Sequence, residues 1–390
     1  MVNRKNRTLL VVIEDALSAL ISKGEITDRY YNPGDLFDDV HILMINNDRP
    51  GLSFVQKMVG RARPYIHNIA PPSCKHTLGW QSSLMQSWLR SVLELTRQIQ
   101  PSLVRAYGNY LNGFLAAYIK RHLGIPLVVS LHTNPDESER ARVRGWTLSS
   151  FKRRLMLKCR KRLERTTLSA ADRVVAVCES YREYALRYGA HVVHVIPNVV
   201  NPTHLHRKTS YDLHSPARVC SVGRQTAGKN PVNLIRAVAE LPVTLTLIGD
   251  GELHEYLRQV TKDCGVMGKV TFLRSVSNDE LCEMLPDFDV FAVHSDYCGI
   301  PKSVIEALLV GLPVVVNRER PSTSELEGDW IYRVENTLQG YRQALLDLME
   351  HYQERIALGN RGYKYAREHF DPRKVEKQLV DLCRELIPDL

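Results

Sequence analysis

Residues 298–308 read Cys-Gly-Ile-Pro-Lys-Ser-Val-Ile-Glu-Ala-Leu, which predicts a Gly-x-Pro turn followed directly by a helix. The first turn of such a helix has unpaired backbone N–H groups and the positive end of the helix dipole, and both attract a phosphate or another anionic group. One turn further along, Glu306 could accept hydrogen bonds from the hydroxyl groups of a ribose. We therefore interpret this segment as an anion-binding helix entrance.

A second candidate site is the loop that follows a predicted strand at 219–222. It begins at Gly223 and carries two cations, Arg224 and Lys229, before the next predicted helix. An arginine offers a planar pair of donors to phosphate oxygens and a lysine offers a mobile point charge, so together they suit a nucleotide diphosphate. Two ordinary surface cations on a solvated loop are the alternative. The helix entrance downstream favours the functional interpretation.

Two shorter motifs could extend such a site. Residues 248–252 contain a Gly-x-Gly but lack the third glycine of a dinucleotide-binding fingerprint, so as evidence for such a site they are weak. His132 follows a predicted strand at 127–131. Open α/β sheets bind their ligands at the carboxyl ends of parallel strands, which makes His132 a candidate. A structural hydrogen bond is the alternative for a single histidine.

The composition describes a soluble globular protein with two domains. A chain of 390 residues exceeds one ordinary core, and 44% apolar with 24% charged residues is not typical of a disordered protein. The eight cysteines form no C-x-x-C pair, which favours reduced thiols in the cytoplasm. Asp287-Phe288-Asp289 has the form of a metal-binding D-x-D motif, but it precedes a predicted strand. We interpret it as a structural turn and expect no metal. The sequence has no apolar stretch near the roughly 20 residues of a membrane-spanning helix, so any membrane contact must be peripheral.

Positive charge is concentrated between Arg140 and Arg165, within a net charge of +9. The region predicts a helix from about Ser149 to Leu168. Its expected apolar stripe is Phe151, Leu155, Cys159 and Leu163, and the cations it could offer to phosphate are Arg153, Arg154, Lys158, Arg160 and Arg162. Anionic lipid headgroups attract such a surface with about 1 kcal/mol per cation. A solvated face, or one that lines the site of a charged acceptor, explains the charge about as well. Nucleic acid is not an expected partner, because no aromatic platform or known nucleic-acid module accompanies the charge.

Short β-branched runs alternate with helical patterns along the whole chain, which predicts parallel sheets covered by helices on both faces. We expect strands at 8–13, 40–45, 103–106, 127–131, 174–177 and 192–196, and then at 219–222, 243–248, 269–273, 290–293 and 313–316. The segment 197–216 has the composition of a linker. The expected domains are therefore 1–199 and 200–371, followed by a last helix at 372–390 with Val375, Leu379, Leu382 and Leu386 on one side.

The helix entrance, the loop at 223–231 and the turn at 249–251 together resemble the donor site of the family-4 retaining glycosyltransferases of the GT-B fold. The resemblance is close from Val195 to about Phe370 and looser in the first half. It implies two Rossmann-like, doubly wound α/β domains that face each other across a cleft, with the acceptor bound by the first domain and the nucleotide sugar by the second. The last helix would pack back on the N-terminal domain.

The implied activity is transfer of a hexose, with retention and without a metal or cofactor, from a nucleotide diphosphate sugar to a hydroxyl group of a glycan or lipid-linked glycan. Such transfer belongs to cell-surface polysaccharide biosynthesis in the cytoplasm or on the inner face of the cell membrane. Arg224 and Lys229 would grip the diphosphate with the N–H groups of residues 302–304, Glu306 would hold the ribose, and His132 would contact the transferred sugar. Further donor-binding positions implied are Gly223, Gly249, Asp250, Arg274, Val276, Cys298, Gly299, Ile300, Pro301, Lys302, Ser303 and Val304.

The sequence departs from the family at several points. Cys298 stands where the family has the first of two glutamates eight positions apart, and Arg274 stands where relatives generally have glycine. Residues 14–18 replace the glycine-rich turn after the first strand. The missing carboxylate at 298 motivates a second hypothesis, a catalytically silent subunit that binds a nucleotide sugar or a glycan.

Overall fold

The computed structural model describes residues 7–22, 27–72, 83–136, 150–201, 203–297, 299–318 and 326–388. These residues form two compact units. Unit 1 contains the described residues up to Pro197 together with those from Arg373 onward, and unit 2 runs from Asn198 to Pro372. The chain therefore passes from unit 1 to unit 2 close to the predicted boundary at 199/200, and it returns at the last helix.

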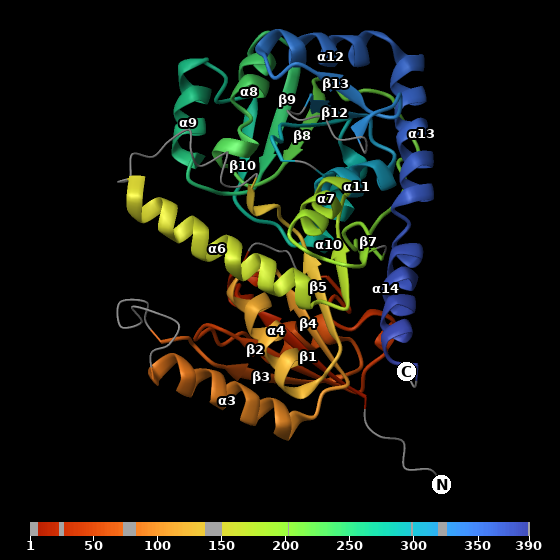
Figure 1. Cartoon of the computed structure of the whole chain (residues 1–390). Coiled ribbons are helices and arrows are strands. Elements are labelled where there is room, and N and C mark those ends of the chain that lie inside the picture. The colour runs from red at the N-terminus through yellow and green to blue at the C-terminus, as the bar shows by residue number, and fades with distance from the viewer. Residues whose placement is uncertain are drawn as a thin grey trace. The chain divides into compact units, whose positions relative to one another are not determined.

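Unit 1 is built on a parallel sheet of seven strands in the order β3-β2-β1-β4-β5-β6-β7 (Figure 1). The strands are β1 (Thr8–Ile13), β2 (Asp39–Met44), β3 (Arg63–Asn68), β4 (Leu103–Tyr107), β5 (Leu127–Leu131), β6 (Arg173–Ala176) and β7 (Val193–Val195). The helices are α1 (Leu17–Ser22), α2 (Leu52–Val59), α3 (Ser83–Ile99), α4 (Leu111–Leu123), α6 (Ser150–Ala170), α7 (Glu179–Arg187) and α14 (Pro372–Leu386), with a 3-10 turn η1 (Pro33–Asp35). The direction of strand addition reverses between β1 and β4, which is where doubly wound sheets bind ligands.

Unit 2 has a parallel sheet of six strands in the order β10-β9-β8-β11-β12-β13. The strands are β8 (Ala217–Val222), β9 (Val243–Ile248), β10 (Val270–Leu273), β11 (Val290–Val293), β12 (Val314–Asn317) and β13 (Tyr332–Val334). The helices are α8 (Val232–Ala239), α9 (His254–Asp263), α10 (Asn278–Met284), α11 (Lys302–Val310), α12 (Leu338–Glu350) and α13 (Tyr352–His369), with 3-10 turns η2 (Ala227–Lys229) and η3 (Leu285–Asp287). Here the order reverses between β8 and β11, so the carboxyl ends of these two strands mark the expected ligand edge.

Both faces of the unit 2 sheet are covered, as predicted for a parallel sheet. Neighbouring residues of β8 show this alternation: Val219 belongs to an apolar cluster with Leu234 of α8, and Cys220 belongs to a second cluster with Leu308 of α11. The predicted fold class, two Rossmann-like α/β domains, is confirmed.

Two strands were not predicted from the sequence, and both lie at sheet edges. In β3, exposed and partly exposed residues alternate, and Pro64 interrupts any apolar run. An edge strand tolerates a proline because one side of its backbone needs no ladder hydrogen bond. In β13 only Val334 is buried. Edge strands bury less side-chain surface, so their sequences lack the signal that marks the central strands.

The basic helix α6 buries a different face from the predicted stripe. Cys159 is exposed, whereas Leu163, Glu164, Thr167 and Leu168 are buried. This face packs on α4, where a side chain at Gly113 would meet Thr167 at 2.6 Å. The buried face includes an acid because Glu164 accepts a hydrogen bond of 2.8 Å from Arg160.

Because α6 buries a different face from the predicted one, fewer of the predicted cations are available to bind phosphate. Arg160 is bound to Glu164, whereas Lys158, Arg162 and Arg165 are exposed. The segment 140–149 and the side chains of Phe151, Arg153, Arg154 and Leu155 lie outside the described residues. Among the described helices, none is long and apolar enough to cross a membrane.

Helix α14 is packed on unit 1 through the predicted apolar side. Val375, Leu379 and Leu382 are buried, and Leu386 is partly exposed. Two ion pairs add to this packing: Arg29 with Glu376 at 3.3 Å and Arg173 with Glu385 at 3.5 Å. The last helix thus belongs to the N-terminal unit, although it follows the whole of unit 2 in the sequence.

Candidate functional site

Two glycines allow the ends of β8 and β9 to approach closely. The Gly223 N–H donates to the carbonyl of Ile248 over 2.9 Å, and the Gly249 N–H donates to that of Leu273 over 2.8 Å. Gly249 has φ of +133°, and a Cβ atom there would collide with the carbonyl oxygen of Gly223. These glycines, both predicted site residues, therefore shape the backbone at the carboxyl edge of the sheet.

Gln225 organises the loop after β8, a role that the sequence alone did not indicate. The side chain is only 2% exposed, and its Nε2 donates to the Gly249 carbonyl over 2.7 Å. Its Oε1 lies 2.7 Å from Nδ1 of His254, and its backbone N–H donates to the Asp250 carbonyl over 2.9 Å. A glutamine between Arg224 and Lys229 looks like a solvated loop residue, but here it joins the loop to the turn at 249–251.

A histidine after β11 fixes the second half of the same loop. His294 is buried, and its Nδ1 accepts the backbone N–H of Asn230 over 2.8 Å. Because Nδ1 is an acceptor, the ring proton lies on Nε2, which donates to Asp296 Oδ1 over 3.0 Å. The Asp296 N–H in turn donates to the Gly228 carbonyl over 2.9 Å. A small cavity at this edge is lined by Gly223, Gln225, Lys229 and His294, among others.

The predicted helix entrance begins α11 and is attached to the end of β8. Gly299 has φ of +90°, a backbone conformation that favours glycine, and Pro301 precedes the first helical residue. Ser303 Oγ donates to the Val222 carbonyl over 3.1 Å, which brings the first turn of α11 beside the loop of Arg224 and Lys229. Cys298 lies outside the described residues.

The amide of Val304 already has a partner within the first turn of α11. Its N–H donates to the Pro301 carbonyl over 2.9 Å, because the helix closes a tight first turn. Lys302 and Ser303 are the remaining predicted residues whose amides could face an anion. Ile300 is buried and Pro301 partly exposed, so these two shape the turn.

Glu306 is buried with one side-chain partner that was not predicted. It is 1% exposed, and its Oε1 accepts a hydrogen bond of 2.7 Å from Asn278 Nδ2. Lys302 Nζ lies 3.7 Å from the same oxygen and 3.3 Å from Asn278 Oδ1. Among the described residues, the polar contacts of Glu306 all go to Oε1, so Oε2 is the oxygen that could accept a ligand hydroxyl. Burial raises the pKa of Glu306, and Lys302 and Asn278 oppose that increase.

The remaining predicted residues of unit 2 lie at the surface of the same edge. Arg224 is exposed. Arg274 is paired with Asp250 at 3.4 Å and with Glu255 at 3.1 Å, so the structure brings two predicted site residues together. Val276 is partly exposed.

His132 lies in unit 1, at the end of β5, and contacts tyrosines that were not predicted. Its Nε2 is 3.4 Å from the hydroxyl group of Tyr30. Its ring is parallel to that of Tyr107, with centroids 5.7 Å apart and an interplanar angle of 8°. Tyr107 ends β4 just as His132 follows β5, so the strand-end argument could also have identified Tyr107. Burial raises the pKa of Tyr107 to about 12, so its hydroxyl remains a donor at neutral pH.

The D-x-D sequence forms a turn held by backbone hydrogen bonds. Asp289 is buried, and its Oδ2 accepts the N–H of Arg218 over 2.7 Å and that of His214 over 3.2 Å. Asp287 lies in the 3-10 turn η3. The Asp289 carboxylate therefore holds the start of β8, in keeping with a structural turn. Within the described ranges, no group of three or more metal-binding side chains gathers.

Two family models match the chain, one over each half. Residues 38–204 match the model described as Glycosyltransferase Family 4, and residues 207–365 match the model described as Glycosyl transferases group 1. Together they cover most of both units.

Curated relatives include glycosyltransferases of bacteria and archaea. A lipopolysaccharide core biosynthesis glycosyltransferase of Rhizobium meliloti, LpsE, is 32% identical over 149 residues, which is 37% of this chain and 43% of the relative. The aligned region thus spans less than half of that protein. An uncharacterized glycosyltransferase of Methanocaldococcus jannaschii is 24% identical over 289 residues, which is 68% of this chain and 71% of the relative.

A solved structure with the same fold contains a nucleotide. The crystal structure of HepE from Anabaena in complex with UDP has a TM-score of 0.73 and 15% sequence identity, and the match covers 97% of this chain and 100% of HepE. A structure of HepE in complex with UDP-glucose has a TM-score of 0.71 and 16% identity, and it covers 98% of this chain and 100% of that chain. At this level of identity the likeness shows the fold.

Proposed function

Because this chain belongs to the glycosyltransferases with the GT-B fold, we propose that it transfers a hexose from a nucleotide diphosphate sugar to a hydroxyl group. The acceptor is a glycan or lipid-linked glycan, by analogy with the lipopolysaccharide core transferase that the chain resembles. The transfer retains the anomeric configuration and uses neither a metal nor a cofactor.

One observation carries the proposal. The bond from Ser303 Oγ to the Val222 carbonyl places the first turn of α11 beside the loop that holds Arg224 and Lys229. Two cations and a helix N-terminus at the edge where the strand order reverses suit a diphosphate. The supporting polar groups, Gln225 and His294, are buried and hydrogen-bonded, which favours a site that is preorganised before any ligand binds.

In this proposal, these groups stabilise the leaving group. As the bond from the anomeric carbon to the diphosphate oxygen breaks, negative charge grows on the diphosphate. The acceptor oxygen forms the new bond to the anomeric carbon, and its proton passes to the departing diphosphate oxygen. Arg224, Lys229 and the N-terminal turn of α11 oppose that charge. Removal of one preorganised donor of this kind costs on the order of 10²–10³ in rate.

Three further residues have proposed roles. Glu306, through Oε2, accepts a ribose hydroxyl, and His132 contacts the transferred sugar. Asp296, held by the Nε2 proton of His294, supplies a carboxylate two positions before Cys298. It could accept the sugar hydroxyls that a glutamate at 298 would otherwise bind.

The test is transfer of labelled hexose by Arg224→Ala and Glu306→Ala, with UDP binding measured in parallel. We expect Arg224→Ala to lose transfer by about 10²-fold or more. Arg258→Ala is the matched control, since Arg258 is an exposed arginine of α9 in the same unit. Full activity in both site variants would contradict the site assignment.

The second hypothesis, a binding subunit without turnover, is motivated by Cys298. It predicts that UDP or UDP-glucose stabilises the protein in a thermal-shift measurement while no acceptor is glycosylated. A ligand at 100 times its dissociation constant stabilises a protein by about 2.7 kcal/mol, so the shift identifies the donor. Transfer by the wild type would exclude this hypothesis, and transfer gained only by Cys298→Glu would favour it.

An anionic membrane surface is a proposed partner of α6. Its exposed cations, Lys158, Arg162 and Arg165, follow a segment of the sequence that is also rich in arginine. Binding to vesicles with anionic lipid, and no binding to vesicles of neutral lipid, is the expected result. Equal binding to both kinds of vesicle would show that these cations do not direct α6 to an anionic membrane surface.

A further inference from the structure

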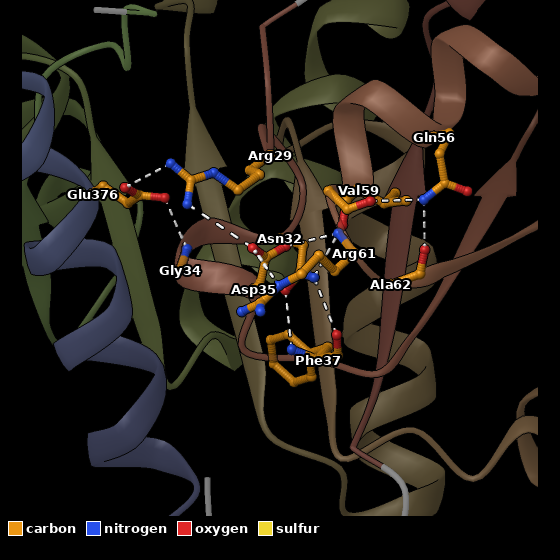
Figure 2. A network of polar contacts seen from close by, with 11 residues as sticks. Arg29, Asn32, Gly34, Asp35, Phe37, Gln56, Val59, Arg61, Ala62 and Glu376 are labelled. Carbon is orange, nitrogen blue, oxygen red and sulfur yellow. Dashed lines mark hydrogen bonds and ion pairs between the residues drawn. The ribbon is translucent and has the colours of Figure 1, made fainter.

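The segment 27–38, between α1 and β2, is tied to helix α14. Glu376 Oε1 accepts the backbone N–H of Gly34 over 2.9 Å, and Oε2 accepts from the guanidinium group of Arg29 over 3.3 Å (Figure 2). Glu376 lies in the first turns of α14, just after the chain returns to unit 1 at Arg373. One carboxylate thus holds two points of a segment that is more than 300 residues away in the sequence.

The same segment places a tyrosine against His132. The Tyr30 hydroxyl lies 3.4 Å from His132 Nε2, and the two rings are 6.1 Å apart. The Tyr30 carbonyl accepts the hydroxyl of Tyr107 over 3.1 Å. Tyr31 packs edge-on against Tyr107 with centroids 4.9 Å apart. A displacement of this segment would therefore move Tyr30, which contacts the His132 ring, and would change the packing around Tyr107.

The backbone of the segment has an unusual shape and is held from two sides, by α14 and by α2. Arg29 and Asp35 have φ of +54° and +51°, values that residues other than glycine rarely adopt, and Gly34 has +64°. Asp35 is held on its other side by the N–H of Arg61 at 2.8 Å (Figure 2). On the side of α2, the backbone N–H groups of Arg29 and Tyr31 donate to the carbonyls of Lys57 and Met58 over 2.9 Å each. A backbone in this region persists only where surrounding contacts impose it, so loss of the Glu376 contacts, which hold the segment from the side of α14, should let residues 29–34 shift.

We propose that Glu376 is a positioning residue for His132: through Gly34 and Arg29 it sets the position of Tyr30, and through Tyr30 that of the His132 ring. This inference rests on the proposed contact of His132 with the transferred sugar. Glu376 belongs to unit 1 and the proposed diphosphate site to unit 2, so its effect should fall on transfer and not on nucleotide affinity.

The experiment compares Glu376→Gln with Glu385→Gln, both in the full-length chain. Glu385 is the matched control because it also joins α14 to unit 1, through Arg173, without touching the segment 27–38. Each variant is assayed for kcat, for KM of the sugar donor and for UDP affinity. The ring signals of His132 are recorded by NMR with labelled histidine, and His132→Gln identifies them.

For Glu376→Gln we expect a fall of about tenfold in kcat, since small misplacements of reacting groups are costly. UDP affinity should stay within about twofold, and the His132 signals should shift. Glu385→Gln should leave the kcat and the His132 signals as in the wild type. If the two variants behave alike in both measurements, whether changed or unchanged, the proposal is overturned.

A variant that does not fold and a protein that does not transfer sugar can each be distinguished from failure of the proposal. If Glu376→Gln does not fold, Arg29→Gln removes one of the two contacts and takes its place with the same expectations. If no form of the protein transfers sugar, the proposed function fails while the NMR comparison still decides whether Glu376 positions His132.

Discussion

Asn230 donates its backbone N–H to Nδ1 of the buried His294 over 2.8 Å, and this single bond decides which nitrogen of the ring carries the proton. The N–H group of Nε2 then donates a hydrogen bond to Asp296 Oδ1 over 3.0 Å. The histidine therefore joins the loop at 223–231 to the segment before α11, and each of its nitrogens can be tested separately.

Replacing His294 with leucine should lower the free energy of unfolding by about 1–3 kcal/mol, because the buried N–H of Asn230 loses its acceptor. His294→Asn offers an oxygen near the position of Nδ1 and should recover part of that loss. Both variants lack the bond to Asp296, so both should weaken binding of the nucleotide sugar more than binding of UDP. Urea unfolding and calorimetric titration measure the two effects. An unchanged stability of His294→Leu would contradict the assigned bond.

Asn278→Ala should destabilise the protein more at pH 8 than at pH 5. Burial already raises the pKa of Glu306 above its unfolded value, and loss of the Asn278 hydrogen bond raises it further. Between the unfolded and folded pKa values the native state binds more protons, so stability falls as the pH rises through this window. Urea unfolding at the two pH values tests this, with Asn233→Ala as a control for an exposed asparagine hydrogen bond. A pH-independent loss would mean that Glu306 is not the group affected.

Gly249→Ala should be among the most damaging single substitutions in unit 2. The new methyl group meets both an unfavourable φ of +133° and the carbonyl oxygen of Gly223. Gly265 has φ of +68°, and a Cβ atom there would meet no atom within 4 Å. Gly265→Ala therefore measures the cost of the backbone conformation without a steric clash, which is about 1–2 kcal/mol. We expect Gly249→Ala to cost clearly more than that in urea unfolding and to reduce UDP binding. Equal costs at the two positions would mean that the close approach of β8 and β9 adjusts easily.

Two histidines on β2 and β3 should make unit 1 sensitive to acid. His41 Nδ1 lies 2.9 Å from His67 Nε2, and burial followed by the charge of His67 lowers the pKa of His41 to about 4. Burial also lowers the pKa of His67. The unfolded chain binds these protons near pH 6.5 and the folded chain does not, so stability should fall as the pH decreases from 6.5 toward 4. His41→Gln should flatten that dependence in urea unfolding, whereas an unchanged slope would assign it to other groups.

The sequence was most informative where a residue is central in a sheet or follows a buried strand. The six residues of β1 and of β9 were predicted with their observed bounds. Strand β1 is a buried apolar run, and in β9 buried apolar residues alternate with threonines, so both sequences are rich in β-branched residues. Likewise, Gly223, Lys229 and His132 follow strands, and the structure places them at the carboxyl edges of their sheets.

The rest depended on contacts between distant segments. Gln225, Asn278 and His294 look like ordinary polar residues in the sequence, and only the fold brings each to its partner 24 to 64 positions away. The predicted buried face of α6 was wrong for the same reason. Glu164 is buried because it is paired with Arg160. Since both residues are charged, the spacing of apolar residues could not identify the face on which they lie.

Because the chain returns to unit 1 at Arg373, unit 2 is inserted into the sequence of unit 1. Unit 1 needs two separate stretches of the sequence, whereas 198–372 supplies all six strands of the second sheet without interruption. For expression this is a practical asymmetry, because unit 2 can be excised as one continuous fragment. Unit 1 requires residue 197 to be joined to residue 373 by a linker, because a fragment that simply stops at 197 would lack α14 and expose the side chains that it buries.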